Sequence, residues 1–238
     1  MEEKNINNPN GKLELTASTK HEDLLVGTRK DGKSYTVRKH RKNYFMPDMW
    51  LKLVEQLPTQ KAKMTAKFMI QTGCRITEGT FVEDKDCDYD RNTIKLRVTK
   101  TKARKKGEER GVPRTIPINS EFMKELKKHF KALPPSAKIG LLSIPAMNIA
   151  LKKAAKEIGM DDWYMFSTHN IRKTHGNWLK IMGNVGFMKI DASEICLRLG
   201  HDYNTFLSDY GSSGVMNTND LMLIKKILGD LYARQNAM

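Results

Sequence analysis

Between His169 and Tyr210 the sequence gathers polar side chains that can bind and attack a phosphate group. His169 and Arg172 open this stretch, His201 lies near its far end, and Tyr210 closes it. Guanidinium and imidazole groups donate hydrogen bonds to phosphate oxygens, and a tyrosine hydroxyl can act as a nucleophile. These residues predict an enzyme that holds a phosphodiester and attacks it without a metal ion. Such a site would need a further arginine and a lysine from elsewhere in the chain.

The first two of these side chains are predicted to lie at the beginning of a helix. Ser167 or Thr168 would cap it, and His169 and Arg172, three residues apart, would share one face within the first turn. Backbone N–H groups and the helix dipole favour an anion at a helix start. The placement therefore suits a bound phosphate.

A shorter helix is predicted to lead to the other two groups. It would begin at Asp191 or Ser193 and end at Leu199-Gly200, so that His201 follows the turn. Tyr210 comes nine residues after that histidine.

The further arginine follows a predicted pair of helices. Pro47 suits a first helical turn and is followed by apolar residues at helical spacing, and a second helix through Phe68 would end at Gly73. Arg75 would then lie at a helix junction and point inward.

The lysine is expected in a β-hairpin. Apolar and polar residues alternate from Thr93 to Val98, which is typical of a half-buried strand, and Val112 to Ile118 would return as an edge strand. The long connection between them is strongly basic. Lys100 lies at the end of the first strand, and Lys102 lies on the same strand face, so either register could place a lysine in the site.

Three more helices complete a fold class that is mostly α with a small antiparallel β-sheet (α+β). They are predicted from Ser120 to Phe130, after Ser143, and after a cap at Thr218 or Asn219. The last helix is amphipathic, and its pattern does not reveal whether its apolar side packs on its own subunit or on a neighbour's. Residues 43–238 would form one catalytic domain with this helix at its end.

Residues 1–42 are polar and end in a basic run. We predict a largely disordered arm with a short strand at Ser34–Arg38, because so few apolar residues can hardly offset the entropy of ordering. This arm could contact a DNA backbone, or it could be a solvated tail without a role, and the sequence leaves both alternatives open. The basic residues that would make this contact are Arg38, Lys39, Arg41 and Lys42.

The composition favours nucleic acid as the partner. The chain of 238 residues holds 42 Lys and Arg against 27 Asp and Glu, a formal charge of +15, which attracts polyanions.

Three widely spaced cysteines form neither a CxxC pair nor an even disulfide set, which fits a reducing compartment. No apolar run approaches the length of about 18 residues that a membrane span needs, and the N-terminus lacks the apolar core of a signal peptide. We expect a cytoplasmic protein associated with the nucleoid.

In order and spacing these residues resemble the catalytic domain of the tyrosine recombinase, or phage integrase, family. The resemblance covers roughly residues 43–210 and implies a site-specific DNA recombinase or integrase that cleaves and rejoins double-stranded DNA through a 3′-phosphotyrosine. It rests on these motifs, which Tyr210 follows: Thr72-Gly73-Cys74-Arg75-Ile76-Thr77-Glu78, Thr99-Lys100-Thr101, His169-Asn170-Ile171-Arg172 and Leu199-Gly200-His201.

The resemblance implies the main catalytic roles. Arg75 and Arg172 would neutralise the nonbridging oxygens of the scissile phosphate, because a guanidinium offers paired donors that match a phosphate face. Tyr210 would attack phosphorus, and Lys100 would protonate the leaving 5′ oxygen. Tyr203 is the rival nucleophile, but the spacing of the family motif favours Tyr210.

The remaining polar residues would assist. His169 would help to take the tyrosine proton and hold the phosphate, and His201 would donate a further hydrogen bond to it. Glu78, three residues after Arg75, would orient that guanidinium. The basic residues expected to bind DNA around the site are Lys102, Arg104, Lys105, Lys106 and Lys173.

Two features depart from the family pattern. Lys173 follows the motif arginine where the family often has histidine. Residues 1–42 are also too few and too polar to form the usual N-terminal core-binding domain of about a hundred residues. Either the protein is a naturally compact archaeal or viral integrase, or the sequence is a truncated catalytic domain.

The resemblance also sets the expected partners and the alternatives. About four protomers would assemble around recombining DNA, with the C-terminal helix as a candidate for subunit exchange. No cofactor and no metal are expected, because arginines take the place of a cation. A type IB topoisomerase, which uses nearly the same groups, and a DNA-binding protein without catalysis are the alternative functions.

Overall fold

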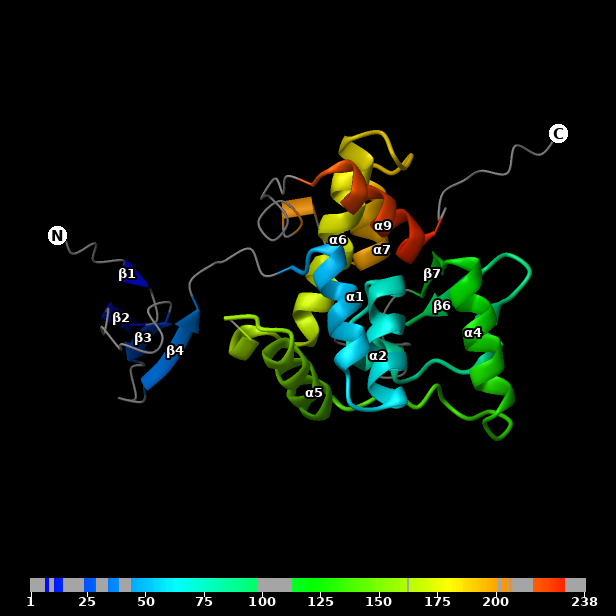
Figure 1. The fold of residues 1–238 in the computed structure, drawn as a ribbon, viewed down its shortest axis with the longest axis horizontal. Helices are drawn as coiled ribbons and strands as arrows, with labels where there is room; N and C mark the ends of the chain where they lie inside the picture. The colour runs from blue at the N-terminus through cyan, green and yellow to red at the C-terminus, as the bar shows by residue number, and fades with distance from the viewer. Residues whose placement is uncertain are drawn as a thin grey trace, which may run out of the picture. The chain divides into compact units, whose positions relative to one another are not determined.

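The computed structural model describes residues 7–8, 11–14, 24–28, 34–38, 44–97, 113–161, 163–200, 203–204, 206 and 216–229. The chain divides into two compact units, residues 1–42 and residues 43–238, and each is described by itself (Figure 1).

The first unit contains a four-stranded antiparallel sheet with the strand order β1-β2-β3-β4. The strand predicted at Ser34–Arg38 is confirmed as β4, whereas the other three strands were not predicted. The short β1 and β2 are polar, so no alternating apolar pattern marks them in the sequence. The strands are β1 (Asn7–Asn8), β2 (Gly11–Glu14), β3 (Leu24–Thr28) and β4 (Ser34–Arg38).

The second unit is mostly helical and has one small antiparallel sheet, in the order β5-β6-β7. This composition of helices and one small sheet confirms the predicted fold class. None of the helices in the described ranges is long and apolar enough to cross a membrane. Its described helices are α1 (Pro47–Gln56), α2 (Gln60–Thr72), α3 (Ile76–Gly79), α4 (Ser120–Lys131), α5 (Ile144–Glu157), α6 (Thr168–Asn184), α7 (Ala192–Leu199) and α9 (Thr218–Leu228), with 3-10 helices at Asp84–Asp86 and Trp163–Met165. Its strands are β5 (Cys87–Asp88), β6 (Thr93–Leu96) and β7 (Arg114–Pro117).

Most helix ends lie where the sequence predicted them, and two starts were wrong by a residue or two. Pro47 begins α1, and Gly73 ends α2 with a left-handed φ of 61°. The N-cap of α4 is Asn119, whose side chain accepts a bond from the backbone of Glu121, so Ser120 is already helical. The N-cap of α9 is Asn217. Asparagine satisfies the free N–H groups of a first turn as well as serine or threonine does.

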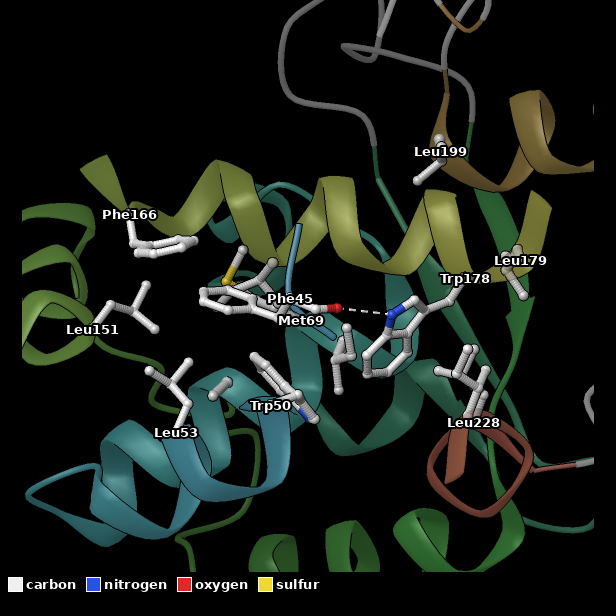
Figure 2. Close-up of a cluster of buried hydrophobic side chains, with 14 of the residues drawn as sticks. Phe45, Trp50, Leu53, Met69, Leu151, Phe166, Trp178, Leu179, Leu199 and Leu228 are labelled. Carbon is white, nitrogen blue, oxygen red and sulfur yellow. Dashed lines mark hydrogen bonds between the residues drawn. The ribbon is translucent and has the colours of Figure 1, made fainter. Parts of the chain in front are cut away.

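Phe45, two residues before α1, anchors the larger core to α6. Its ring stacks on Phe166 with centroids 4.5 Å apart, and its N–H donates to Thr174 Oγ1 at 2.9 Å. Its carbonyl accepts from Trp178 Nε1 at 3.0 Å (Figure 2). Trp178 also meets Trp50 of α1 edge to face, with centroids 6.4 Å apart. Because these side chains are buried and hydrogen-bonded, α6 is a fixed platform for the polar residues at its start.

A second, smaller core joins the sheet to α4 and to α2 (Figure 1). Ile94 and Leu96 of β6 and Ile116 of β7 point into it, as their strand alternation predicted. Phe68 of α2 belongs to this core, whereas Met69 belongs to the larger one. α2 therefore lies between the two cores, and the bend at its end is held from both sides.

The helix α9 packs on its own chain. Leu221, Ile224 and Leu228 are buried in the larger core, where α9 contacts α1 and α2. The side chain of Asn119 donates to the carbonyl of Ile227 at 3.0 Å, which satisfies one of the free carbonyls at the end of this helix. The question that the sequence left open is thus answered for these apolar residues: they pack within the subunit.

Candidate active site

The bend after α2 presents Arg75. Gly73 ends the helix in the left-handed region, and Arg75 takes the N-cap position of α3. The backbone N–H of Arg75 donates to Glu78 Oε2 at 3.0 Å, and its Nη1 donates to Glu78 Oε1 at 3.2 Å. The Arg75 side chain is 24 % exposed, whereas that of Glu78 is fully buried. Glu78 therefore bonds both the backbone and the guanidinium of Arg75, and its role in orienting that guanidinium stays a prediction.

A second arginine shares the same carboxylate. Nη2 of Arg114, at the start of β7, donates to Glu78 Oε2 at 2.6 Å, and the Arg114 side chain is 10 % exposed. Burial alone would raise the pKa of Glu78, but Arg114, the N–H of Arg75 and the charge of Arg172 outweigh it and hold this pKa below its usual value. Glu78 is thus a buried carboxylate that stays ionised.

Arg172 brings three separate motifs together. Its side chain is 1 % exposed, its Nη1 donates to the carbonyl of Gly73 at 2.7 Å, and its Nη2 donates to the carbonyl of Leu199. The guanidinium on α6 is therefore bonded both to the bend that leads to Arg75 and to the end of α7. Charged donors to buried carbonyls make strong bonds, so these three segments have fixed relative positions.

The helix α6 starts where the sequence predicted, but only one of the two predicted groups lies in its first turn. Ser167 is the N-cap, and its N–H donates to Asn170 Oδ1 at 2.8 Å. His169 lies in the first turn and is exposed. Arg172 is the fifth helical residue, so it lies beyond the first turn and turns inward. The prediction that both groups occupy the first turn was therefore wrong for Arg172, because a helix that begins at Thr168 completes its first turn before residue 172.

The end of α7 is held by a buried arginine that the sequence did not single out. Arg198 Nε donates to His175 Nε2 at 2.9 Å, and its Nη2 donates to the carbonyls of Gln71 and Pro117, each at 2.8 Å. Gly200 follows in the left-handed region with a φ of 63°. These bonds fix the turn from which His201 continues.

His175 is a structural histidine. It is completely buried, its Nδ1 lies 2.6 Å from the carbonyl of Ile70, and its Nε2 accepts from Arg198. Burial and the charge of Arg198 hold the pKa of His175 well below its usual range, so the ring is neutral with its proton on Nδ1.

Three residues of this network were missed: Arg114, His175 and Arg198. Arg114 offered a signal, since it shares a strand face with Ile116 and Ile118, both buried, and an arginine in that register must find a partner inside. The partners of Arg198 are distant in sequence, and no local pattern reveals them.

Several predicted site residues fall outside the described part of the chain. Their roles stay predictions. They are Lys39, Arg41, Lys42, Lys100, Lys102, Arg104, Lys105, Lys106, His201 and Tyr210. Arg38 is described only as a backbone position in β4, and Lys173 is half-buried on α6. Within the described ranges, no group of three or more His, Cys, Asp or Glu side chains could hold a metal ion.

The sequence pattern of the phage integrase family matches residues 47–210, which covers every motif placed above. The chain belongs to the phage integrase family. This family member has no match among proteins with a curated description.

The fold of this phage integrase family member is similar to those of solved recombinases. The XerA recombinase has a TM-score of 0.53 and 17 % identity, over 77 % of this chain and 64 % of that one. The Tn1549 transposon integrase in complex with circular intermediate DNA has a TM-score of 0.56 and 16 % identity, over 80 % of this chain and 68 % of that one. The catalytic domain of bacteriophage HP1 integrase has a TM-score of 0.51 and 16 % identity, over 71 % of this chain and 86 % of that one. This chain thus spans somewhat less than two thirds of XerA, and the likeness concerns the fold.

Proposed function

We propose that this phage integrase family member is a site-specific DNA recombinase, which cleaves and rejoins DNA strands through a covalent 3′-phosphotyrosine. The observation that carries the proposal is the position of Arg172, whose guanidinium bonds both the Gly73 and the Leu199 carbonyls. It gathers the segments that lead to Arg75, to His169 and to His201 around one point.

The reaction would proceed by transfer of one phosphoryl group. The Tyr210 oxygen attacks phosphorus, a 3′-phosphotyrosine bond forms, and the 5′ oxygen leaves with a proton from Lys100, or from Lys102 in the other register. His169 would help to accept the tyrosine proton and hold the phosphate, and His201 would donate a further hydrogen bond to the phosphate. The reverse attack by a 5′ hydroxyl rejoins the strand, so no external energy source is required.

The two motif arginines would act from different depths. Arg75 is partly exposed and already oriented by Glu78, so it would bind a nonbridging oxygen directly. Arg172 is buried and would supply a second positive charge to the charge-rich transition state.

Several features support DNA as the substrate. The chain carries a formal charge of +15, and structures of the Tn1549 integrase and of XerH, both similar in fold, were solved with DNA. The residues proposed to contact the DNA backbone are Arg38, Lys39, Arg41, Lys42, Lys102, Arg104, Lys105, Lys106 and Lys173. A location in the cytoplasm, at the nucleoid, follows from this substrate.

Self-association on recombining DNA, with about four protomers, is part of the proposal. Because Leu221, Ile224 and Leu228 pack within the subunit, exchange through α9 would have to use its outer side, where Met222 is exposed.

The test is covalent trapping. The protein is incubated with a library of nicked duplexes, in which the cleaved end diffuses away, and trapped DNA is sequenced to define the target site. We expect an adduct that Tyr210→Phe abolishes and Tyr203→Phe retains. Survival of the adduct in Tyr210→Phe would refute the assignment, and its absence from the unaltered protein would leave a DNA-binding protein without catalysis.

Recombination between two marked copies of that site separates the recombinase from a type IB topoisomerase. We expect exchange of the markers. Relaxation of supercoils without exchange would support the topoisomerase instead.

A further inference from the structure

We infer that Arg114 is a positioning residue for DNA cleavage, because its side chain joins Arg75, the β6–β7 sheet and the end of α7. The inference rests on the proposed function and assigns a role to a residue outside the four recognised motifs. Arg114 is the first residue of β7.

The first link runs to Arg75. Arg114 Nη2 lies 2.6 Å from Glu78 Oε2, and Glu78 Oε1 lies 3.2 Å from Arg75 Nη1. The buried carboxylate thus stands between an inner and an outer guanidinium. Its inner partner fixes its position, and that position sets the direction in which Arg75 points.

The second link runs to α7 and is reciprocal. Arg114 Nε donates to the carbonyl of Arg198 at 2.9 Å, and Arg198 Nη2 donates to the carbonyl of Pro117 at 2.8 Å. Each arginine therefore bonds the backbone of the other's element. The strand β7 and the last turn of α7, which precedes His201, are consequently held in one relative position.

The third observation is a buried donor. Arg114 Nη1 is buried and has no hydrogen-bond partner within the described ranges. A buried unpaired donor costs free energy, so packing alone does not favour arginine at this position over an apolar residue. The arginine is explained by its two other donors, Nε to the Arg198 carbonyl and Nη2 to Glu78. Only a guanidinium offers two such donors in a fixed geometry.

The consequence concerns the charge state of Glu78. The groups that face it are Arg75 from α3, Arg114 from β7 and Arg172 from α6, with the Cys74 thiol nearby, whose pKa burial raises to about 11. Burial favours the protonated carboxyl, and Arg114 is the strongest opposing influence. Loss of Arg114 therefore raises the pKa of Glu78. The carboxylate is then lost as the pH falls, and Arg75 loses its partner with it.

The experiment measures the single-turnover rate of adduct formation on the trapped target site, from about pH 5.5 to about pH 9. We expect Arg114→Met to be slower by about a hundredfold at the acidic end, with a deficit that shrinks as the pH rises. Arg114→Lys, which keeps a cation for Glu78 but cannot bond both elements, should recover part of the loss and much of the pH dependence. The double variant Arg114→Met with Glu78→Gln should be slow at every pH, because no carboxylate is left to titrate.

The controls separate positioning from folding and from the proposed function. Arg91→Met removes an exposed arginine, ion-paired to Asp88 near β6, and should match the unaltered protein. Circular dichroism checks that each variant is folded; if Arg114→Met is not, Arg114→Lys carries the same comparison. Unchanged rates, or a deficit of equal size at every pH in Arg114→Met, would overturn the inference. No Tyr210-dependent adduct from the unaltered protein would instead overturn the proposed function.

Discussion

Three guanidinium groups, those of Arg75, Arg114 and Arg172, act on the one buried carboxylate of Glu78. Among these four side chains, positive charge therefore exceeds negative charge by two. Removing a charge from water costs several kcal/mol unless the charge is paired, so such a cluster is stabilised by a further anion. A phosphate diester bound at Arg75 would supply that anion, which links the residue-scale electrostatics to the substrate.

The choice between Lys100 and Lys102 is a residue-scale prediction. If Lys100 protonates the leaving 5′ oxygen, Lys100→Ala should lose adduct formation on ordinary DNA by about a hundredfold or more. A substrate with a 5′-bridging sulfur should restore it, because a thiolate leaves without a proton. Rates on the two substrates measure this. Rescue of Lys102→Ala in place of Lys100→Ala would move the role by two residues.

The sequence singled out the motif residues but not the residues that surround them. Arg75, Glu78 and Arg172 were identified because they fall in short motifs with fixed spacing. Arg114 lies 36 residues from Glu78, and Arg198 lies 127 residues from Gln71. Contacts of that separation depend on how helices and strands pack, and neither helical nor strand periodicity encodes them.

At the scale of elements, the bend between α2 and α3 is the most constrained piece of backbone. Gly73 lies at a φ of +61°, and a Cβ added there would lie 2.9 Å from His175 Nε2 and 2.9 Å from Leu199 Cδ2. Both neighbours are buried and hydrogen-bonded or packed. A side chain at this position would therefore strain the bend and crowd both neighbours.

Gly73→Ala should consequently lower the free energy of unfolding by about 3 kcal/mol, about 1 of it from the left-handed backbone and the rest from overpacking. Gly159→Ala is the matched control, because its φ is +77° and nothing lies within 4 Å of the added Cβ. It should cost only the backbone part, about 1 kcal/mol. Urea unfolding compares the two, and equal losses would show that the close approach at Gly73 is not rigid.

Helices were predictable at this scale because apolar residues recur at helical spacing over ten or more positions in α1, α2, α4 and α6. The strands β1, β2 and β3 were not, because β1 and β2 together hold a single apolar side chain, Leu13, and Leu24, Leu25 and Val26 of β3 form a run without alternation. Their pairing depends on backbone hydrogen bonds between segments, which composition does not reveal.

At the scale of the whole molecule, the formal charge of +15 predicts binding that weakens steeply with salt. Changing Arg38, Lys39, Arg41 and Lys42 together to Gln should reduce the slope of log affinity against log salt by roughly 0.9 for each phosphate contact that they make. Changing Lys124, Lys127, Lys128 and Lys131, which are exposed on α4, removes the same charge and is the control. Equal reductions in the two variants, measured by fluorescence anisotropy, would contradict a specific role for the basic run.

The most direct measurement identifies the amino acid that is joined to DNA. The trapped covalent complex is digested with nuclease and protease, and the peptide that carries a nucleotide is sequenced by mass spectrometry. We expect the nucleotide on the Tyr210 oxygen, linked through a 3′ phosphate. A nucleotide on Tyr203 or on any other residue, or a link through a 5′ phosphate, would contradict the proposed recombinase.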